Sequence, residues 1–157
     1  MKKQPLTTDL VGGKTLKTDE KIEFFGQIDE LSSLIMEFTH YIDDKNLEMQ
    51  LRKIVSVLTI ASAEIAGGYG HLGELYLNEL TEVLDFYNEK VGPFKCFVLP
   101  GETLKGAKAH ILRTVCRRVE RAYARVYEKY KTSEIIFEYL NKLSSLFFAI
   151  ARLYDEN

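Results

Sequence analysis

From residue 23 to the C-terminus, apolar side chains recur every three or four residues, which is the spacing of one face of an α-helix. Within 23–43 these positions are Ile28, Leu31, Ile35, Phe38 and Ile42. The spacing repeats in 51–65, 72–90, 103–130 and again after residue 133. Because helices joined by short connections favour antiparallel neighbours, the sequence predicts an all-α, single-domain five-helix bundle over residues 1–157.

The fourth predicted helix, residues 103–130, has the longest apolar stripe. Its members are Leu104, Ala107, Ile111, Leu112, Val115, Cys116, Val119, Ala122, Tyr123 and Val126. The fifth helix is expected to begin after Thr132 and Ser133, which are suitable N-caps. The short apolar run 94–99 has no partner strand elsewhere, so we interpret it as an extended connector. Only residues 1–20, which are polar and contain glycine, are expected to be irregular.

Composition limits the class of ligand. The chain has 157 residues, 46% of them hydrophobic, and a net charge of −2, which gives no general attraction to nucleic acid or membranes. Any anion site must therefore be local. The two cysteines, Cys96 and Cys116, lack the spacing of a zinc site, and no secretory signal or membrane-spanning stretch is recognisable, so a cytoplasmic protein with reduced thiols is expected.

Arginine is concentrated in one place. Five of the seven arginines lie within 113–125 on the fourth predicted helix. Arg113, Arg117 and Arg121 are four residues apart and so share a face, where they repel one another unless an anion compensates them. Guanidinium groups suit phosphate and carboxylate oxygens, which favours a phosphate site. A solvated face, or ion pairs with Asp29 and Glu30 of the first helix, is the alternative.

Other candidate sites are weaker. Residues 11–15 read Val-Gly-Gly-Lys-Thr, but a P-loop needs a glycine where this chain has Thr8, and a helix directly afterwards. A nonstandard glycine loop that approaches phosphate remains an alternative. His40, His71 and His110 share no metal-ligand spacing, so no metal site is predicted, and Cys116 lies on the apolar stripe as an inert core residue.

Three separated stretches carry a resemblance to a known family. Residues 97–101 read Phe-Val-Leu-Pro-Gly, and 113–121 read Arg-Thr-Val-Cys-Arg-Arg-Val-Glu-Arg after an Ala-His pair at 109–110. Residues 26–33 and 139–144 read Gly-Gln-Ile-Asp-Glu-Leu-Ser-Ser and Tyr-Leu-Asn-Lys-Leu-Ser. Their order and spacing resemble those of the PduO-type ATP:cob(I)alamin adenosyltransferases over nearly the whole chain.

This resemblance implies a five-helix bundle that forms a homotrimer, with active sites between subunits. It implies transfer of the adenosyl group from ATP to a reduced corrinoid such as cobalamin, with triphosphate as the leaving group and magnesium as its companion ion. A corrinoid reductase is a candidate partner. The protein would then bind triphosphate by charge, aim the ribose carbon at cobalt, and present the corrinoid without its lower axial ligand.

The resemblance also assigns site residues by position. Arg113 would pair with Asp29 and set the geometry of corrinoid and nucleotide, and Phe97 would displace the lower cobalt ligand. The residues expected to bind the nucleotide are Thr7, Thr8, Lys17, Arg117, Arg118, Glu120, Arg121 and Asn141. By its own apolar pattern, Phe97 is expected to be a core residue.

The chain departs from the family at its N-terminus. Where the family has a Thr-Gly-Asp-x-Gly loop for triphosphate and magnesium, residues 1–6 read Met-Lys-Lys-Gln-Pro-Leu. Pro5 has no amide proton to donate, although Lys2 and Lys3 still bring positive charge. Glu102 and Ser145 replace a glycine and an aspartate. Three hypotheses follow: an active adenosyltransferase, a corrinoid or nucleotide carrier or sensor of the same fold, and a helical interaction module.

Overall fold

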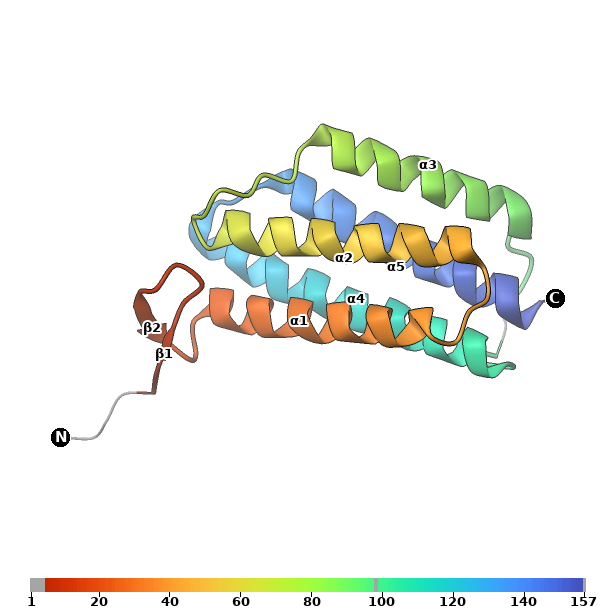
Figure 1. Cartoon of the computed structure of the whole chain (residues 1–157), viewed down its shortest axis with the longest axis horizontal. Coiled ribbons are helices and arrows are strands. Elements are labelled where there is room, and N and C mark those ends of the chain that lie inside the picture. Colours follow the sequence, from red (N-terminus) through yellow and green to blue (C-terminus); the bar gives the residue numbers. More distant parts are fainter. Residues whose placement is uncertain (1–4, 98, 157) are drawn as a thin grey trace.

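The computed structural model describes residues 5–97 and 99–156. Within these residues five helices run along the long axis of the molecule (Figure 1). They are α1 (Glu20–Thr39), α2 (Lys45–Ile65), α3 (Glu74–Val91), α4 (Leu104–Tyr130) and α5 (Glu134–Asp155). The predicted all-α bundle is confirmed. No helix in the described ranges is long and apolar enough to cross a membrane.

Side-chain caps fix where the helices begin. Asp19, Asp44 and Thr103 each accept a hydrogen bond from a backbone amide in the first turn of α1, α2 and α4. Ser133 is the N-cap of α5, as predicted, but its side chain makes no capping bond. The Thr132 hydroxyl instead lies 2.8 Å from a tyrosine hydroxyl of α4, so it ties the turn to the preceding helix.

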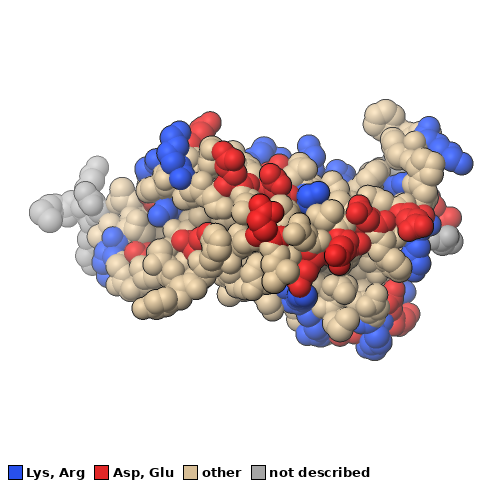
Figure 2. Space-filling view, turned by 90° about the horizontal axis from the view of Figure 1, so that it is seen from above, with Lys and Arg blue, Asp and Glu red and all other residues tan. Residues whose placement is uncertain are grey.

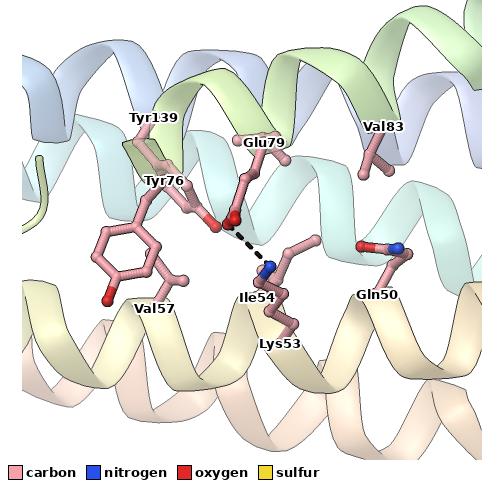
Figure 3. Close-up of a pocket in the computed structure, with 9 residues that line it drawn as sticks. Gln50, Lys53, Ile54, Val57, Tyr76, Glu79, Val83 and Tyr139 are labelled. Carbon is pink, nitrogen blue, oxygen red and sulfur yellow. Dashed lines mark ion pairs between the residues drawn. The ribbon is translucent and has the colours of Figure 1, made fainter. Parts of the chain in front are cut away.

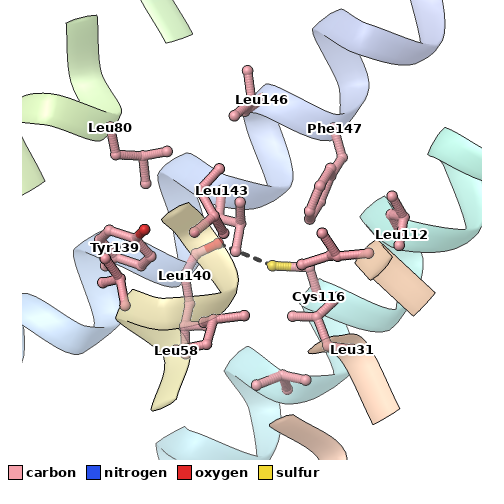
Figure 4. Close-up of a cluster of buried hydrophobic side chains, with 14 of the residues drawn as sticks. Leu31, Leu58, Leu80, Leu112, Cys116, Tyr139, Leu140, Leu143, Leu146 and Phe147 are labelled. Atoms are coloured by element: carbon pink, nitrogen blue, oxygen red, sulfur yellow. Dashed lines mark hydrogen bonds between the residues drawn. The ribbon is translucent and has the colours of Figure 1, made fainter. Parts of the chain in front are cut away.

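The core lies where α4 packs between α1 and α5, while α2 packs on α1 and α3 packs on α5. Leu143 and Phe147 of α5 meet Cys116 of α4 in this core (Figure 4), and all three are fully buried. The Cys116 thiol donates a hydrogen bond to the Leu140 carbonyl at 3.4 Å, and burial raises its pKa far above the usual value. The prediction of an inert core thiol is therefore supported.

The stripe predicted for α4 is wider than its buried seam. Leu104 and Ile111 are 65% and 50% exposed, so not every position of the apolar stripe packs in the core. Leu104 is the first residue of the helix, and Ile111 lies at the edge of the seam between α4 and α1, beside Leu34 and Lys108. The two helices that pack on α4 therefore bury fewer of its residues than the ten apolar positions of the stripe.

The N-terminal segment contains a small hairpin in place of a wholly irregular chain. β1 (Leu6–Thr8) pairs antiparallel with β2 (Lys14–Leu16), with Thr7 opposite Thr15. The turn between them includes Gly12 at φ 90°, which glycine adopts without strain. The hairpin lies at the end of the bundle opposite to the C-terminus (Figure 1). Lys2 and Lys3, and the rest of 1–4, lie outside the described residues.

Residues 92–103 join α3 to α4 and are called the Phe97 connector below. Its described residues form neither helix nor strand, as expected of a connector. The connector lies at the end of the bundle where the C-terminus lies, away from the hairpin (Figure 1).

Candidate functional site

Two of the predicted arginines open onto one hollow on the α3, α4 and α5 side of the bundle. Arg113 and Arg117, one turn apart on α4, line an open hollow of about 470 Å³. Its other lining residues are Asn88 of α3 and Ser144, Ser145 and Phe148 of α5. A hollow of this size falls in the range of small-molecule sites, and two guanidinium groups make it suitable for an anion.

Most of the arginine row has no carboxylate partner. Arg118 pairs with Glu30 of α1, so the ion-pair alternative is right for that residue. Arg117 and Arg121 make neither an ion pair nor a hydrogen bond with any side chain that the structure describes. The Arg113 pKa is lowered, first by burial and then by the nearby charge of Arg117. The positive charge of Arg113, Arg117 and Arg121 therefore has no carboxylate partner among the described residues, and two of these arginines line the hollow.

Asn141 and Glu120 lie next to this row, on α5 and α4. The Asn141 amide donates a hydrogen bond to Glu120 at 3.4 Å. The hydroxyl groups of Ser144 and Ser145 donate hydrogen bonds to the backbone carbonyl of Asn141 at 2.9 and 3.3 Å. Both serines also line the hollow. The structure therefore joins Glu120 to Asn141, and joins Asn141 to two serines that line the hollow together with Arg117.

A second hollow of about 660 Å³ lies between the hairpin, α1 and α2. Its lining includes Thr7, Thr8 and Asp29, three of the predicted residues. Asp29 and Arg113 make no ion pair with each other within the described chain, since they line different hollows. Five of the predicted site residues thus line two separate hollows of one chain.

The glycine turn of the hairpin does not resemble a phosphate loop. The Asp9 carboxylate accepts hydrogen bonds from the Val11 and Gly13 amides at 3.0 and 2.7 Å. A strand, not a helix, begins at Lys14, whose ammonium donates to the Thr8 hydroxyl at 2.9 Å. The rejection of a P-loop agrees with this geometry. Amides already bonded to a carboxylate also argue against the nonstandard phosphate loop.

Lys17 has an exposed side chain just after β2 and does not line the second hollow. Its amide donates to the Pro5 carbonyl at 2.8 Å, which extends the pairing of the hairpin by one bond. Its predicted role in triphosphate binding rests on the family resemblance.

Phe97 is 99% exposed, so the expectation of a core residue was wrong. Its ring centroid lies 6.3 Å from that of Phe94, which lies 5.6 Å from that of Phe148. Phe148 lines the arginine hollow. A row of aromatic rings therefore leads from the exposed Phe97 to the arginines, and sequence reasoning missed both Phe94 and Phe148 because apolar residues at these positions look like ordinary core.

A further small cavity between α2 and α3 is not a substrate site. Its volume is about 20 Å³, which holds about one water molecule. Lys53 and Glu79 form an ion pair across it at 2.9 Å, and Tyr139 of α5 also lines it (Figure 3). The described residues contain no group of three or more His, Cys, Asp or Glu side chains placed to hold a metal ion.

Charge on the α3 face points away from anion binding. Figure 2 shows acidic side chains near the middle of the face seen from above, with basic ones interspersed. α3 lies uppermost in Figure 1 and contains five acidic residues against one basic residue, Lys90; the acidic residues are Glu74, Glu79, Glu82, Asp85 and Glu89. The basic residues are concentrated on α4 instead.

Comparisons with known proteins agree with this geometry. A family model described as cobalamin adenosyltransferase matches residues 5–154. A corrinoid adenosyltransferase from Citrobacter freundii is 30% identical, over 95% of this chain and 89% of that protein. One from Bacillus subtilis is 33% identical, over 94% and 81%. The solved structure of a variant PduO-type ATP:corrinoid adenosyltransferase from Lactobacillus reuteri, complexed with cobalamin and ATP, superposes with a TM-score of 0.87 at 25% identity, covering 97% of this chain and 89% of that one.

Proposed function

This chain belongs to the cobalamin adenosyltransferase family, and from this we propose that it transfers the 5′-deoxyadenosyl group from ATP to the cobalt of a reduced corrinoid. The substrate cobalt, as Co(I), donates an electron pair to the 5′ carbon of ATP. The bond from that carbon to the triphosphate oxygen breaks, and triphosphate leaves with its electrons. Cobalt is thereby oxidised to Co(III), and the product is adenosylcobalamin.

The observation that carries the proposal is the uncompensated arginine row beside a hollow. Triphosphate supplies the negative charge that Arg117 and Arg121 lack in the free chain. Arg113 faces the same hollow, where the reacting carbon would be held. Binding that fixes the leaving group and the attacked carbon together converts a bimolecular encounter into an oriented reaction.

We propose that the remaining predicted residues bind the nucleotide around this row. Arg118, Glu120 and Asn141 border it on α4 and α5, and the Glu120 to Asn141 contact would orient the amide. Thr7 and Thr8 would contribute hydroxyl groups from the second hollow, and Lys17 a positive charge from the chain beyond β2.

Phe97 is proposed to contact the corrinoid. A phenyl ring that is fully exposed gains free energy when a large planar ligand covers it. Placed on the lower side of the corrinoid, the ring would occupy the space of the lower axial ligand. Water would be excluded there as well, and loss of that ligand makes reduction to Co(I) easier.

Magnesium is proposed to arrive with ATP. Protein sites for Mg²⁺ that involve nucleotides use few carboxylates and several phosphate oxygens. The absence of a dedicated ligand cluster among the described residues is compatible with that arrangement.

An electron donor must reduce the corrinoid cobalt to Co(I) before transfer, so a corrinoid reductase is the proposed partner. The free thiols of Cys96 and Cys116 support a cytoplasmic location.

We propose a homotrimer in which the two hollows of neighbouring subunits face each other. Asp29 lies in one hollow and Arg113 in the other, so the pair expected from the family would form only between subunits. Mixing two inactive variants tests this arrangement. When Asp29→Asn and Arg113→Ala chains are refolded together, each mixed trimer contains one site built from two unmutated halves.

Random mixing at equal amounts should therefore restore about a quarter of the wild-type activity. Each variant mixed with itself should stay inactive and serves as the control. If the two residues act within one subunit, the mixture stays inactive and the trimeric site is wrong. A measured mass other than that of three chains would also contradict it.

A carrier or sensor of corrinoid or nucleotide is the second candidate. The observation in its favour is the hairpin, which offers few backbone amides for a triphosphate. The Val11 and Gly13 amides already donate to Asp9, and Pro5 has no amide proton. Calorimetric titration with ATP distinguishes the adenosyltransferase from the carrier or sensor. Tight binding of ATP that tripolyphosphate displaces supports the enzyme, because both use the arginine row. Corrinoid binding without any ATP binding would favour the carrier.

A further inference from the structure

The last turn of α5 holds the first end of the Phe97 connector. Arg152 is nearly buried, and its guanidinium donates hydrogen bonds to the backbone carbonyls of Gly92 at 2.9 Å and Val91 at 3.2 Å. Its remaining donors bond Glu156 at 2.8 and 3.2 Å. The chain is thereby fixed where it leaves α3, five residues before Phe97.

Asp155, three residues further along α5, holds the second end. One carboxylate oxygen accepts from the Gly101 amide at 3.2 Å, and the other accepts from the Thr103 amide and hydroxyl at 2.9 and 3.0 Å. Its side chain is only 4% exposed. A Cβ atom at Gly106 would overlap the carboxylate, so this close approach needs glycine there.

The position of this carboxylate is unusual. An acidic group at the C-terminus of its own helix is unfavourable, but Asp155 also lies at the N-terminus of α4, where the helix dipole attracts an anion. Three donors from the connector and the cap satisfy it. Their arrangement ties the end of α5 to the start of α4 and to the connector between α3 and α4.

The same carboxylate faces His110, which contacts Arg113. His110 Nε2 is buried, has no hydrogen-bond partner among the described residues, and lies 3.6 Å from the nearer Asp155 oxygen. His110 Nδ1 accepts a hydrogen bond from Arg113 Nε at 3.2 Å. An acceptor at Nδ1 places the ring proton on Nε2, directed at the carboxylate. Asp155 thus attracts the Nε2 proton across 3.6 Å and favours the ring orientation in which Nδ1 accepts from the guanidinium.

We propose that Asp155 is a positioning residue that couples the Phe97 connector to Arg113. One buried carboxylate holds the connector at Gly101 and Thr103, and through His110 it sets the direction in which Arg113 points into its hollow. Movement of the connector therefore changes the orientation of Arg113. Holding of the connector stands on the structure alone, whereas the effect on turnover rests on the proposed adenosyl transfer.

Asp155→Asn is the informative variant because it is isosteric. Its amide oxygen can still accept from Thr103, but its NH₂ group then faces the Gly101 amide and His110 Nε2, which are themselves donors. The variant therefore loses the contacts with Gly101 and His110 and keeps those with Thr103, the N-cap of α4. Asp43→Asn is the matched control, because it removes the same charge from a side chain that is 99% exposed.

The connector can be observed without any reaction. Cys96 is exposed and adjacent to Phe97, while Cys116 is buried and unreactive, so a nitroxide thiol reagent labels Cys96 selectively in the full chain. The electron paramagnetic resonance spectrum should narrow in Asp155→Asn and stay unchanged in Asp43→Asn. An unchanged spectrum in Asp155→Asn, with the label attached, overturns the proposal.

Kinetics with ATP and chemically reduced cobalamin test the coupling. Asp155→Asn should lower kcat by roughly tenfold to a hundredfold, the cost of misplacing a reacting group, and leave the KM for ATP unchanged. The visible spectrum of bound cob(II)alamin should show more of the form that retains its lower axial ligand. A loss of kcat that only follows the unfolded fraction, with an unaltered cobalamin spectrum, overturns the coupling. If the wild type itself does not turn over, the proposed function fails, and the resonance spectrum still decides whether Asp155 holds the connector.

Discussion

Removing the guanidinium of Arg117 should weaken ATP binding and leave the fold as stable as before. The side chain is exposed, makes no ion pair or hydrogen bond among the described residues, and repels Arg113. Its removal therefore breaks no contact in the free chain. Exposed substitutions of this kind change the free energy of unfolding by less than about 0.5 kcal/mol, and relief of the repulsion acts in the stabilising direction.

The loss of binding should be much larger. A hydrogen bond to a charged group is worth about 1.5–3 kcal/mol, which corresponds to roughly a tenfold to 150-fold rise in the Kd for ATP. Calorimetric titration of Arg117→Ala with ATP gives the Kd, and urea unfolding followed by circular dichroism gives the stability. The two numbers together separate a binding residue from a structural one.

Arg125→Ala provides the matched control, because Arg125 lies two turns along the same helix, is exposed, and does not line the hollow. It should change the Kd for ATP by much less than Arg117→Ala. Equal losses for both variants would mean that only the general positive charge matters. A normal Kd in Arg117→Ala, combined with a destabilised fold, would refute the assignment of the arginine row to triphosphate.

Three further predictions concern the site, the core and pH. Arg113→Ala should abolish adenosyl transfer while circular dichroism shows an intact bundle; unchanged turnover would remove Arg113 from the site. Phe147→Ala should lower the free energy of unfolding by about 3–5 kcal/mol in urea titrations, because the ring is fully buried, and a loss below about 1 kcal/mol would contradict the packing. His110 has a lowered pKa because of burial and, next, the charge of Arg113, so the unfolded chain binds its proton more readily. Stability should therefore fall as pH drops below about 6.5, and His110→Gln should make this fall shallower; identical pH profiles would show that the ring is not held neutral.

The helices were predictable because their signals are local. Periodic apolar residues such as Leu31 and Ile35 mark buried faces, and Thr103 marks the start of α4. The exposure of Ile111 was not predictable, since a stripe gives no information on how many neighbours cover it. The hairpin was also missed: its three-residue strands are too short for a periodic signal, and they depend on the turn around Gly12.

The site was predictable only in part. The four-residue spacing of Arg113 and Arg117 does place both on one hollow. The separation of Asp29 from Arg113 depends on how α1 and α4 pack, and no spacing along the chain contains that information. Asp155 shows the same limit. It gives no signal at the end of the sequence, and its contacts with Gly101 and Thr103 join residues more than fifty positions apart.

Anaerobic turnover is the most direct test of adenosyl transfer by this protein. ATP and chemically reduced cobalamin are mixed with the protein, and visible absorbance follows the conversion of the Co(I) form into adenosylcobalamin. Product should form at a rate that saturates with both substrates, which would also show that the altered N-terminus supports catalysis. No product, with corrinoid or ATP binding still detectable, would contradict adenosyl transfer and favour a carrier or sensor.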